Sequence, residues 1–294
     1  MYYYAAYFSL IRSGMFNPST DHIRFAVPTG NFGDVLAGFF AKRMGLPISK
    51  LIIATNENDI LYRFWQTGSY EKSTVHNTQN EKTLGSGVKA TLSPAMDILV
   101  SSNFERLLWF LAYDVFCSNV NGLQNKRHGA GVKVKEWQAS LKTAGGFCVE
   151  REVLDAARVD FSSERVSDKE TLATIRDVYR WSNSGELDLN NVVLDPHSAI
   201  SVTAALRSSR TAPDTHCVAL ATAHPAKFSQ AVEMALAKEE SFQFSRILPQ
   251  EFLGLESLPK RSIRVQKSDG LDGIRNIIME TVQRQLNKKP CRSD

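Results

Sequence analysis

The alternation of apolar and polar residues divides the chain into short buried strands and helices with one apolar side. Short apolar runs that predict strands occur at residues 25–27, 51–54, 192–194 and 217–220. A segment with helical features follows each of these runs. A strand–helix–strand order favours a parallel sheet, so the pattern predicts an α/β fold.

The first predicted strand runs into a glycine loop, T-G-N-F-G at residues 29–33, and then into a helix. Glycine lets the backbone approach a ligand closely, and the free N–H groups of a first helical turn attract anions. The spacing matches neither G-x-x-x-x-G-K-[ST] nor G-x-G-x-x-G. The loop alone therefore leaves two interpretations open, an anion site and a tight turn without a ligand.

Two other segments follow the carboxyl ends of predicted strands, where open parallel sheets bind their ligands. Residues 55–59 come directly after the second strand, and Thr222 comes after the last one. We expect both to lie beside the ligand crevice. For Thr222 the alternative is a hydroxyl that caps the helix beginning near Pro225.

The two predicted domains differ in their secondary structure. Residues 1–70 and 188–294 form one α/β domain in this interpretation, and residues 90–187 form a mainly helical insertion. Polar stretches at residues 73–89 and 119–135 predict surface loops.

Several helix boundaries can be predicted from capping residues. Ser102 and Ser167 are each followed three residues later by Glu, which fits the capping box. Asp195 precedes a proline, and this pair suits a cap and a first helical position. Residues 262–265 and 271–286 predict a final strand and helix.

Composition and charge describe an ordinary globular protein. Of 294 residues, 43% are hydrophobic and 22% are charged. A formal charge of +4 is small for this length and argues against nucleic-acid or membrane partners. The cysteines show no C-x-x-C spacing, which favours reduced thiols in a cytoplasmic protein over disulfides or a metal site; they are Cys117, Cys148, Cys217 and Cys291.

The first residues, 1–11, are apolar and aromatic, and no charged side chain precedes Arg12. They lack the basic region of a signal peptide and are too short to span a bilayer. The pattern predicts the interior of a buried helix. We therefore expect the chain to be the later part of a longer protein.

Sequence blocks along the chain resemble threonine synthase of the longer fungal and bacterial type. They are V-P-T-G-N-F-G-D, A-T-N-E-N-D-I-L, S-P-A-M-D-I-L-V-S-S-N-F-E-R-L-L-W, L-D-P-H-S-A and T-A-H-P-A-K-F, in the order of the family. The resemblance covers nearly the whole chain from Arg24 onward. It implies a fold-type II pyridoxal-phosphate enzyme that converts O-phospho-L-homoserine and water to L-threonine and phosphate, by elimination at Cγ and addition at Cβ.

The resemblance also assigns site residues. It implies that the cofactor's phosphate is cradled by Gly30, Asn31, Phe32 and Gly33. Asp34 would stand at the start of the helix and cap its free amides, and Thr222 would face the pyridine nitrogen. A hydroxyl partner can leave that nitrogen unprotonated, which tunes how strongly the ring withdraws electrons.

One family feature is missing from the sequence. Such enzymes hold the cofactor as a Schiff base on a lysine that lies well before the glycine loop, and here no lysine precedes Lys42. We therefore expect a C-terminal portion of threonine synthase that has no catalytic residue of its own and is inactive as this chain. The alternative is a non-catalytic α/β remnant that binds phosphate or pyridoxal 5'-phosphate. The expected partner is a small-molecule substrate, and the oligomeric state stays open, a monomer included.

Overall fold

The computed structural model describes residues 1–72, 83–84, 87–117, 120–185, 191–260 and 262–287. The chain divides into two compact units, Met1–Leu248 and Pro249–Asp294.

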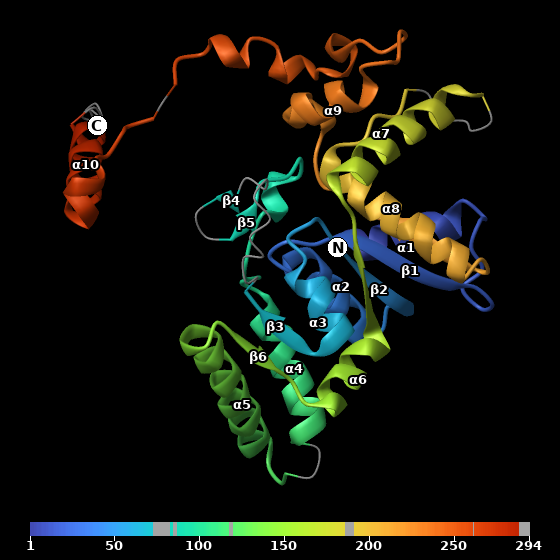
Figure 1. Cartoon of the computed structure of the whole chain (residues 1–294), viewed down its shortest axis with the longest axis vertical. Helices are drawn as coiled ribbons and strands as arrows, with labels where there is room; N and C mark the ends of the chain where they lie inside the picture. The colour runs from blue at the N-terminus through green and yellow to red at the C-terminus, as the bar shows by residue number, and fades with distance from the viewer. Residues whose placement is uncertain (73–82, 85–86, 118–119, 186–190, 261, 288–294) are drawn as a thin grey trace, which may run out of the picture. The chain divides into compact units, whose positions relative to one another are not determined.

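The first unit is built on a parallel sheet, as the strand–helix pattern predicts (Figure 1). Its strands lie in the order β7-β2-β1-β8. Every neighbouring pair is parallel. Their bounds are β1 (His22–Pro28), β2 (Ile48–Thr55), β7 (Phe161–Arg165) and β8 (Thr215–Ala219).

One of the predicted strands does not form, and one strand of the sheet was not predicted. Residues 192–194 form no strand. Val193 and Leu194 pack instead against a helical cluster around Ile175 and Tyr179. The sheet position is taken by β7, whose sequence F-S-S-E-R gives no apolar run because it is an edge strand.

The two faces of the sheet are covered by different helices. Side chains alternate along a strand, so Phe25 and Val27 point to one face and Ala26 to the other. The first face packs against α2 (Gly33–Arg43), α3 (Ile60–Thr67) and α6 (Arg151–Asp160). The second packs against α8 (Pro196–Thr211), through Ile200 and Ala204.

Outside the sheet, the predicted alternation of strands and helices is only partly regular. Helix α7 (Asp168–Asn183) packs on α8 and on α9 (Ser229–Leu236). Short 3-10 turns fall at η1 (Pro94–Met96), η2 (Pro225–Phe228) and η3 (Phe244–Ile247).

Residues 90–187 contain α4 (Phe104–Phe116) and α5 (Leu123–Thr143), which pack side by side (Figure 1). The expected polar loop at 119–135 is therefore wrong over most of its length. Ala130, Trp137 and Leu141 are the buried side chains of α5, and they fall on one helical side. The domain division expected from the sequence stays a prediction, and β7 of this region joins the main sheet.

The two expected capping boxes have different outcomes. The Ser167 box is present, because its hydroxyl accepts from Glu170 N and the Glu170 carboxylate accepts from Ser167 N. The Ser102 box is absent, because α4 begins one residue later, with Asn103 at its cap position. The Ser102 hydroxyl instead donates to Asn31 Oδ1 at 3.3 Å.

Small antiparallel pairs complete the first unit. They are β3 (Ser69–Glu71) with β6 (Gly146–Cys148), and β4 (Thr83–Leu84) with β5 (Val88–Lys89). Most of the predicted loop at 73–89 lies outside the described residues.

The first helix, α1 (Tyr2–Arg12), forms where the sequence predicts a helix. The expectation that it is buried throughout is wrong, because Tyr3 and Tyr7 are its buried residues while Tyr2 and Phe8 are exposed by about half. The helix is buried on one side only, which its uniformly apolar and aromatic sequence does not reveal. Tyr3 packs edge-on against Phe25 of β1, at 5.0 Å between ring centroids.

The second unit contains η4 (Gln250–Phe252), η5 (Leu255–Ser257), η6 (Lys267–Asp269) and α10 (Gly270–Leu286). Helix α10 confirms the predicted final helix. The strand predicted at 262–265 is not formed, because those residues have no paired neighbour strand in the described part of the chain. No helix among the described residues has the length and apolar character that crossing a membrane requires.

Candidate functional site

The strand order creates a natural crevice beside β1. From β1 the chain proceeds to β2 and β7 on one side, and it returns to place β8 on the other. The order therefore reverses between β1 and β8. Open α/β sheets bind ligands outside the carboxyl ends of the strands at such a switch point.

A cavity of about 440 Å³ lies at this position. Its lining joins the segment after β1 with the segment after β8, and consists of Tyr2, Gly33, Asp34, Leu220, Ala221 and Thr222. The structure thus brings together three of the residues that the sequence assigned to a site. The remaining three, Gly30, Asn31 and Phe32, belong to the same loop but do not line this cavity.

The carbonyl groups of the glycine loop are held by protein. Ser101 Oγ donates to Gly30 O at 2.6 Å, and the Asn103 backbone N and Nδ2 donate to Asn31 O at 3.1 and 2.9 Å. Within the described residues, the N–H groups of the loop donate to no acceptor from Gly30 to Gly33. The loop therefore presents free donors at the start of α2, which suit a phosphate group.

Phe32 anchors the loop. Its φ of 65° lies in the left-handed region, which a bulky side chain rarely adopts. The ring is 1% exposed and packs against Phe104, Trp65 and Phe161, with centroids 5.2 to 6.1 Å away. The side chain of Phe32 therefore belongs to the core, which leaves its backbone as the part that a ligand could contact.

Asp34 does not cap the helix, which corrects the expectation from sequence. Helix α2 has Phe32 at its cap position and no side-chain cap bond. The Asp34 carboxylate instead accepts hydrogen bonds from the hydroxyls of Tyr2, at 2.5 Å, and Tyr3, at 3.2 Å. Burial raises the pKa of Asp34, and the two hydroxyl bonds offset part of that effect.

Thr222 is exposed to the cavity, and its position is fixed through its backbone. The Thr222 N donates to Ser198 Oγ at 3.2 Å. Ser201 Oγ donates to Leu220 O at 2.8 Å, so α8 holds both ends of this short segment. The Thr222 hydroxyl has no hydrogen-bond partner among the described residues. The cap of the following turn is His224, whose Nδ1 accepts from Ala226 N at 3.2 Å.

Asp195 supports the segment of Thr222 indirectly, through Ser198. The sequence predicted Asp195 only as a helix cap. Its carboxylate accepts from His197 N at 2.9 Å, Ser198 N at 3.3 Å and the Ser198 hydroxyl. Burial by itself raises the pKa of Asp195, but the bonds from His197 and Ser198 outweigh it and hold that pKa below its usual value. The carboxylate is thus fixed in its charged form.

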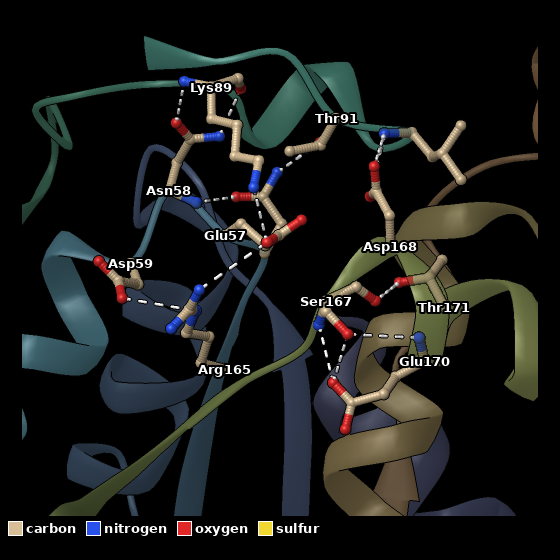
Figure 2. Close-up of polar contacts among 12 residues, drawn as sticks. Glu57, Asn58, Asp59, Lys89, Thr91, Arg165, Ser167, Asp168, Glu170 and Thr171 are labelled. Atoms are coloured by element: carbon tan, nitrogen blue, oxygen red, sulfur yellow. Dashed lines mark hydrogen bonds and ion pairs between the residues drawn. The ribbon is translucent and has the colours of Figure 1, made fainter. Parts of the chain in front are cut away.

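A second polar cluster lies at the carboxyl ends of β2 and β7 (Figure 2). Glu57 pairs with Lys89 at 2.9 Å and with Arg165 at 3.8 Å. Asn58 exchanges two hydrogen bonds of 2.9 Å with the backbone of Lys89, and Asp168 accepts from the backbone N of Leu92 (Figure 2). The loop at 55–59, expected to contact a ligand, thus bonds largely to β5 and, through Asn56, to Thr91 and Ser93 in the segment that follows it.

Sequence reasoning missed the role of this following segment, residues 91–103. Its residues hold the carbonyl side of the glycine loop, as Ser101 and Asn103 show. The available signal was the run S-S-N at 101–103, whose polar side chains precede an apolar helix and are not used as a capping box. Among the described residues, no group of three or more His, Cys, Asp or Glu side chains is placed to hold a metal ion.

The comparisons with known proteins agree with the motifs. The family model described as "Threonine synthase, C-terminal" matches residues 198–278. Threonine synthase of Schizosaccharomyces pombe is 42% identical over 287 residues, which cover 97% of this chain and 52% of the relative. Threonine synthase of Pseudomonas aeruginosa is 45% identical over 214 residues, covering 72% of this chain and 38% of the relative.

Solved structures give the same result. The crystal structure of yeast threonine synthase matches with a TM-score of 0.76 and 42% identity, over 89% of this chain and 48% of that one. A threonine synthase from Brucella melitensis with bound pyridoxal phosphate matches with a TM-score of 0.66 and 39% identity, over 90% and 46% of the two chains. The fold class expected from the sequence is confirmed.

The chain spans about half the length of the curated relatives it matches. The resemblance inferred from the glycine loop and the other sequence blocks is confirmed over this half. By sequence and by fold, the chain is similar to about half of the threonine synthases of fungi and bacteria.

Proposed function

We propose that this chain forms the phosphate-cradle side of a pyridoxal 5'-phosphate site in a threonine synthase. The whole protein would convert O-phospho-L-homoserine and water to L-threonine and phosphate. The observation that carries the proposal is the cavity at the switch point, which has Gly33 and Asp34 on one wall and Thr222 on the other. For location we propose the cytoplasm, since the scattered cysteines suit a reducing compartment.

The residues present fit the cofactor at both of its polar ends. The free N–H groups of Gly30, Asn31, Phe32 and Gly33 would bind the phosphate. The carbonyl oxygens of Gly30 and Asn31 would not repel it, because they accept hydrogen bonds from Ser101 and Asn103. The Thr222 hydroxyl, without a protein partner in the described structure, would face the pyridine nitrogen. When bound, the cofactor supplies an electron sink for a carbanion on the substrate.

Thr222 contributes a neutral partner at a fixed place. Its backbone N is bound to Ser198 Oγ, so the side chain is presented from a held segment. A hydroxyl can donate to an unprotonated ring nitrogen, whereas a carboxylate would favour the protonated ring. The tyrosine hydroxyls that bind Asp34 orient its carboxylate toward α1, which reduces its repulsion of a phosphate at the neighbouring amides.

The sequence itself favours a second candidate for this chain in isolation. No lysine precedes Lys42, and Lys227 lies in the T-A-H-P-A-K-F block, where it lines a different hollow with Thr91 and Leu92. The second candidate is a non-catalytic module that binds phosphate or the cofactor. Both candidates use the same cradle, and they differ in whether a covalent amine is available to the cofactor.

The test of the proposal is cofactor binding by the chain and its Thr222 variants. We expect pyridoxal 5'-phosphate to bind and its absorbance to change. Thr222→Ser should bind alike because the hydroxyl remains. Thr222→Asp should bind more weakly, by about tenfold or more, because a charge enters a site shaped for a neutral group. Thr143→Asp at the far end of α5 is the control for an added charge. Equal affinity in all variants would refute the assignment of Thr222.

The two candidates are separated by borohydride reduction of the mixture, followed by peptide mapping. We expect no single stoichiometric lysine adduct and no phosphate release from O-phospho-L-homoserine by this chain alone. An adduct on one lysine together with phosphate release would show that the chain is an enzyme by itself.

A further inference from the structure

Asn56, directly after β2, is a buried side chain that binds a neighbouring segment. It is 1% exposed. Its Nδ2 lies 2.8 Å from Asp97 Oδ1 and 2.9 Å from both Ser93 Oγ and Thr91 Oγ1. Its Oδ1 accepts from Asn58 N at 2.9 Å. Every polar atom of the Asn56 side chain is therefore engaged within the protein.

Asp97 is the common acceptor of this network. Besides Asn56, its carboxylate accepts from Thr91 N at 2.9 Å, Thr91 Oγ1 at 2.7 Å and Asn58 Nδ2 at 2.9 Å. Hydrogen bonds to a charged acceptor are about twice as strong as neutral ones. The pair Asn56–Asp97 thus closes residues 91–97 into a compact loop and fastens it to the end of β2.

The turn at the centre of this loop, η1, supports the glycine loop. A Cβ added to Gly30 would lie 3.0 Å from Ala95 O and 3.1 Å from Met96 Cα. Both contacts are with backbone atoms, which cannot rotate away. The position of η1 therefore limits where the backbone of Gly30 can lie.

The same segment then fastens the carbonyl side of the glycine loop. Tyr70 OH accepts from Ser101 N at 2.8 Å, and Ser101 Oγ donates to Gly30 O. The Asn103 N donates to Asn31 O. Residues 91–103 thus bond to the loop through its carbonyl oxygens and the Asn31 side chain, whereas the N–H groups from Gly30 to Gly33 donate to no acceptor among the described residues.

We propose that Asn56 and Asp97 are positioning residues for the phosphate cradle. They fix η1 against Gly30, and η1 in turn orients the free N–H groups toward a phosphate. The inference rests on the proposed function for its ligand. It adds that a buried amide–carboxylate pair, outside the cavity, determines the affinity of the cradle.

The perturbation is Asn56→Asp, which puts a second carboxylate at the place of the amide that faces Asp97. We expect the affinity for pyridoxal 5'-phosphate to fall by about 10- to 100-fold, the size seen when a supporting residue behind a ligand is lost or a site shifts by about 1 Å. The exchanged pair, Asn56→Asp with Asp97→Asn, restores a donor opposite an acceptor. It should recover most of the affinity.

A matched control separates positioning from general stability. Thr174 and Thr203 form a buried hydroxyl pair of 2.7 Å between α7 and α8, remote from the loop in its bonding. Thr174→Val should lower the melting temperature while leaving cofactor affinity unchanged. If Asn56→Asp folds poorly, the isosteric variant Asp97→Asn takes its place, with a smaller expected loss.

The second measurement needs no ligand. Amide hydrogen exchange of peptides covering residues 94–104 reports the bonds Met96 N to Ser93 O and Asn103 N to Asn31 O. We expect faster exchange in Asn56→Asp, recovery in the exchanged pair, and parent-like exchange in Thr174→Val.

The outcomes distinguish this inference from the proposed function. Failure of the parent chain to bind pyridoxal 5'-phosphate would refute the proposed function, and the exchange measurement would then decide the positioning role alone. Parent-like affinity or parent-like exchange in a folded Asn56→Asp variant would overturn the inference. Loss of both in Asn56→Asp and recovery of both in the exchanged pair would support it.

Discussion

Replacing Gly30 by alanine tests how tightly the glycine loop is packed. The φ of Gly30 is not positive, so alanine meets no backbone strain there. The added methyl group would instead meet Ala95 O at 3.0 Å and Met96 Cα at 3.1 Å. Contacts this short with backbone atoms force a shift of either the loop or η1, because neither atom lies on a flexible side chain.

The expected cost follows from this crowding. Inserting a methyl group into a well-packed site costs about 1–3 kcal/mol of unfolding free energy. For a unit of this size we expect a melting temperature lower by about 2–4 °C per kcal/mol. The displacement should also weaken binding of pyridoxal 5'-phosphate, because the cradle amides move with the backbone.

Gly33→Ala is the matched control within the same loop. Its Cβ would meet Asn103 Nδ2 at 3.5 Å, an ordinary contact, and Gly33 is one of the residues that line the cavity. We expect a change in stability of less than about 0.5 kcal/mol, with weaker cofactor binding. Thermal unfolding and cofactor titration of both variants make the comparison. A Gly30→Ala protein as stable as the parent would refute the idea that η1 rigidly supports the loop.

Two further predictions concern α7 and α8. Ser167→Ala should lower the unfolding free energy by about 1 kcal/mol, because it removes the observed capping box, whereas Ser102→Ala should cost less than half of that. Urea unfolding measures both, and equal losses would contradict the assignment. The folded pKa of Asp195 is lowered, so its contribution to stability is present above its unfolded pKa of about 4 and is lost as the pH falls through the folded value. Melting temperatures between about pH 3 and pH 7 should therefore fall less steeply on the acid side in Asp195→Asn than in the parent, and parallel curves would count against it.

The sequence predicted the parts of the fold whose signal is local. The glycine loop and the strands on either side of α2 formed as predicted, because apolar runs and glycine act over a few residues. Helix α5 was missed because Gly129 and Gly131 interrupt a polar run, and its burial depends on packing against α4. Strand β7 was missed because its pairing with β2, rather than its own composition, makes it a strand.

The candidate site was predictable in outline only. The rule that ligands bind at the carboxyl ends of parallel strands placed Thr222 and the glycine loop near one crevice, and Thr222 lines one cavity with Gly33 from the end of that loop. The partners of Asp34 could not be predicted, because Tyr2 and Tyr3 approach it from another helix. The same holds for Asn56, whose acceptors lie some 35 to 41 positions further along the chain.

The switch point at β1 and β8 also governs when the site can exist during folding. One cavity wall follows β1, and the other follows β8, whose pairing begins with His22 opposite Thr215. A ribosome therefore completes the first wall long before the second wall is made, and contacts of such sequence separation form slowly. Until β8 arrives, one edge of β1 stays open to other strands, which makes the half-made domain prone to aggregation. A cofactor that contacts both walls would stabilise only the finished arrangement, so it would act late and favour the native pairing of β1 with β8.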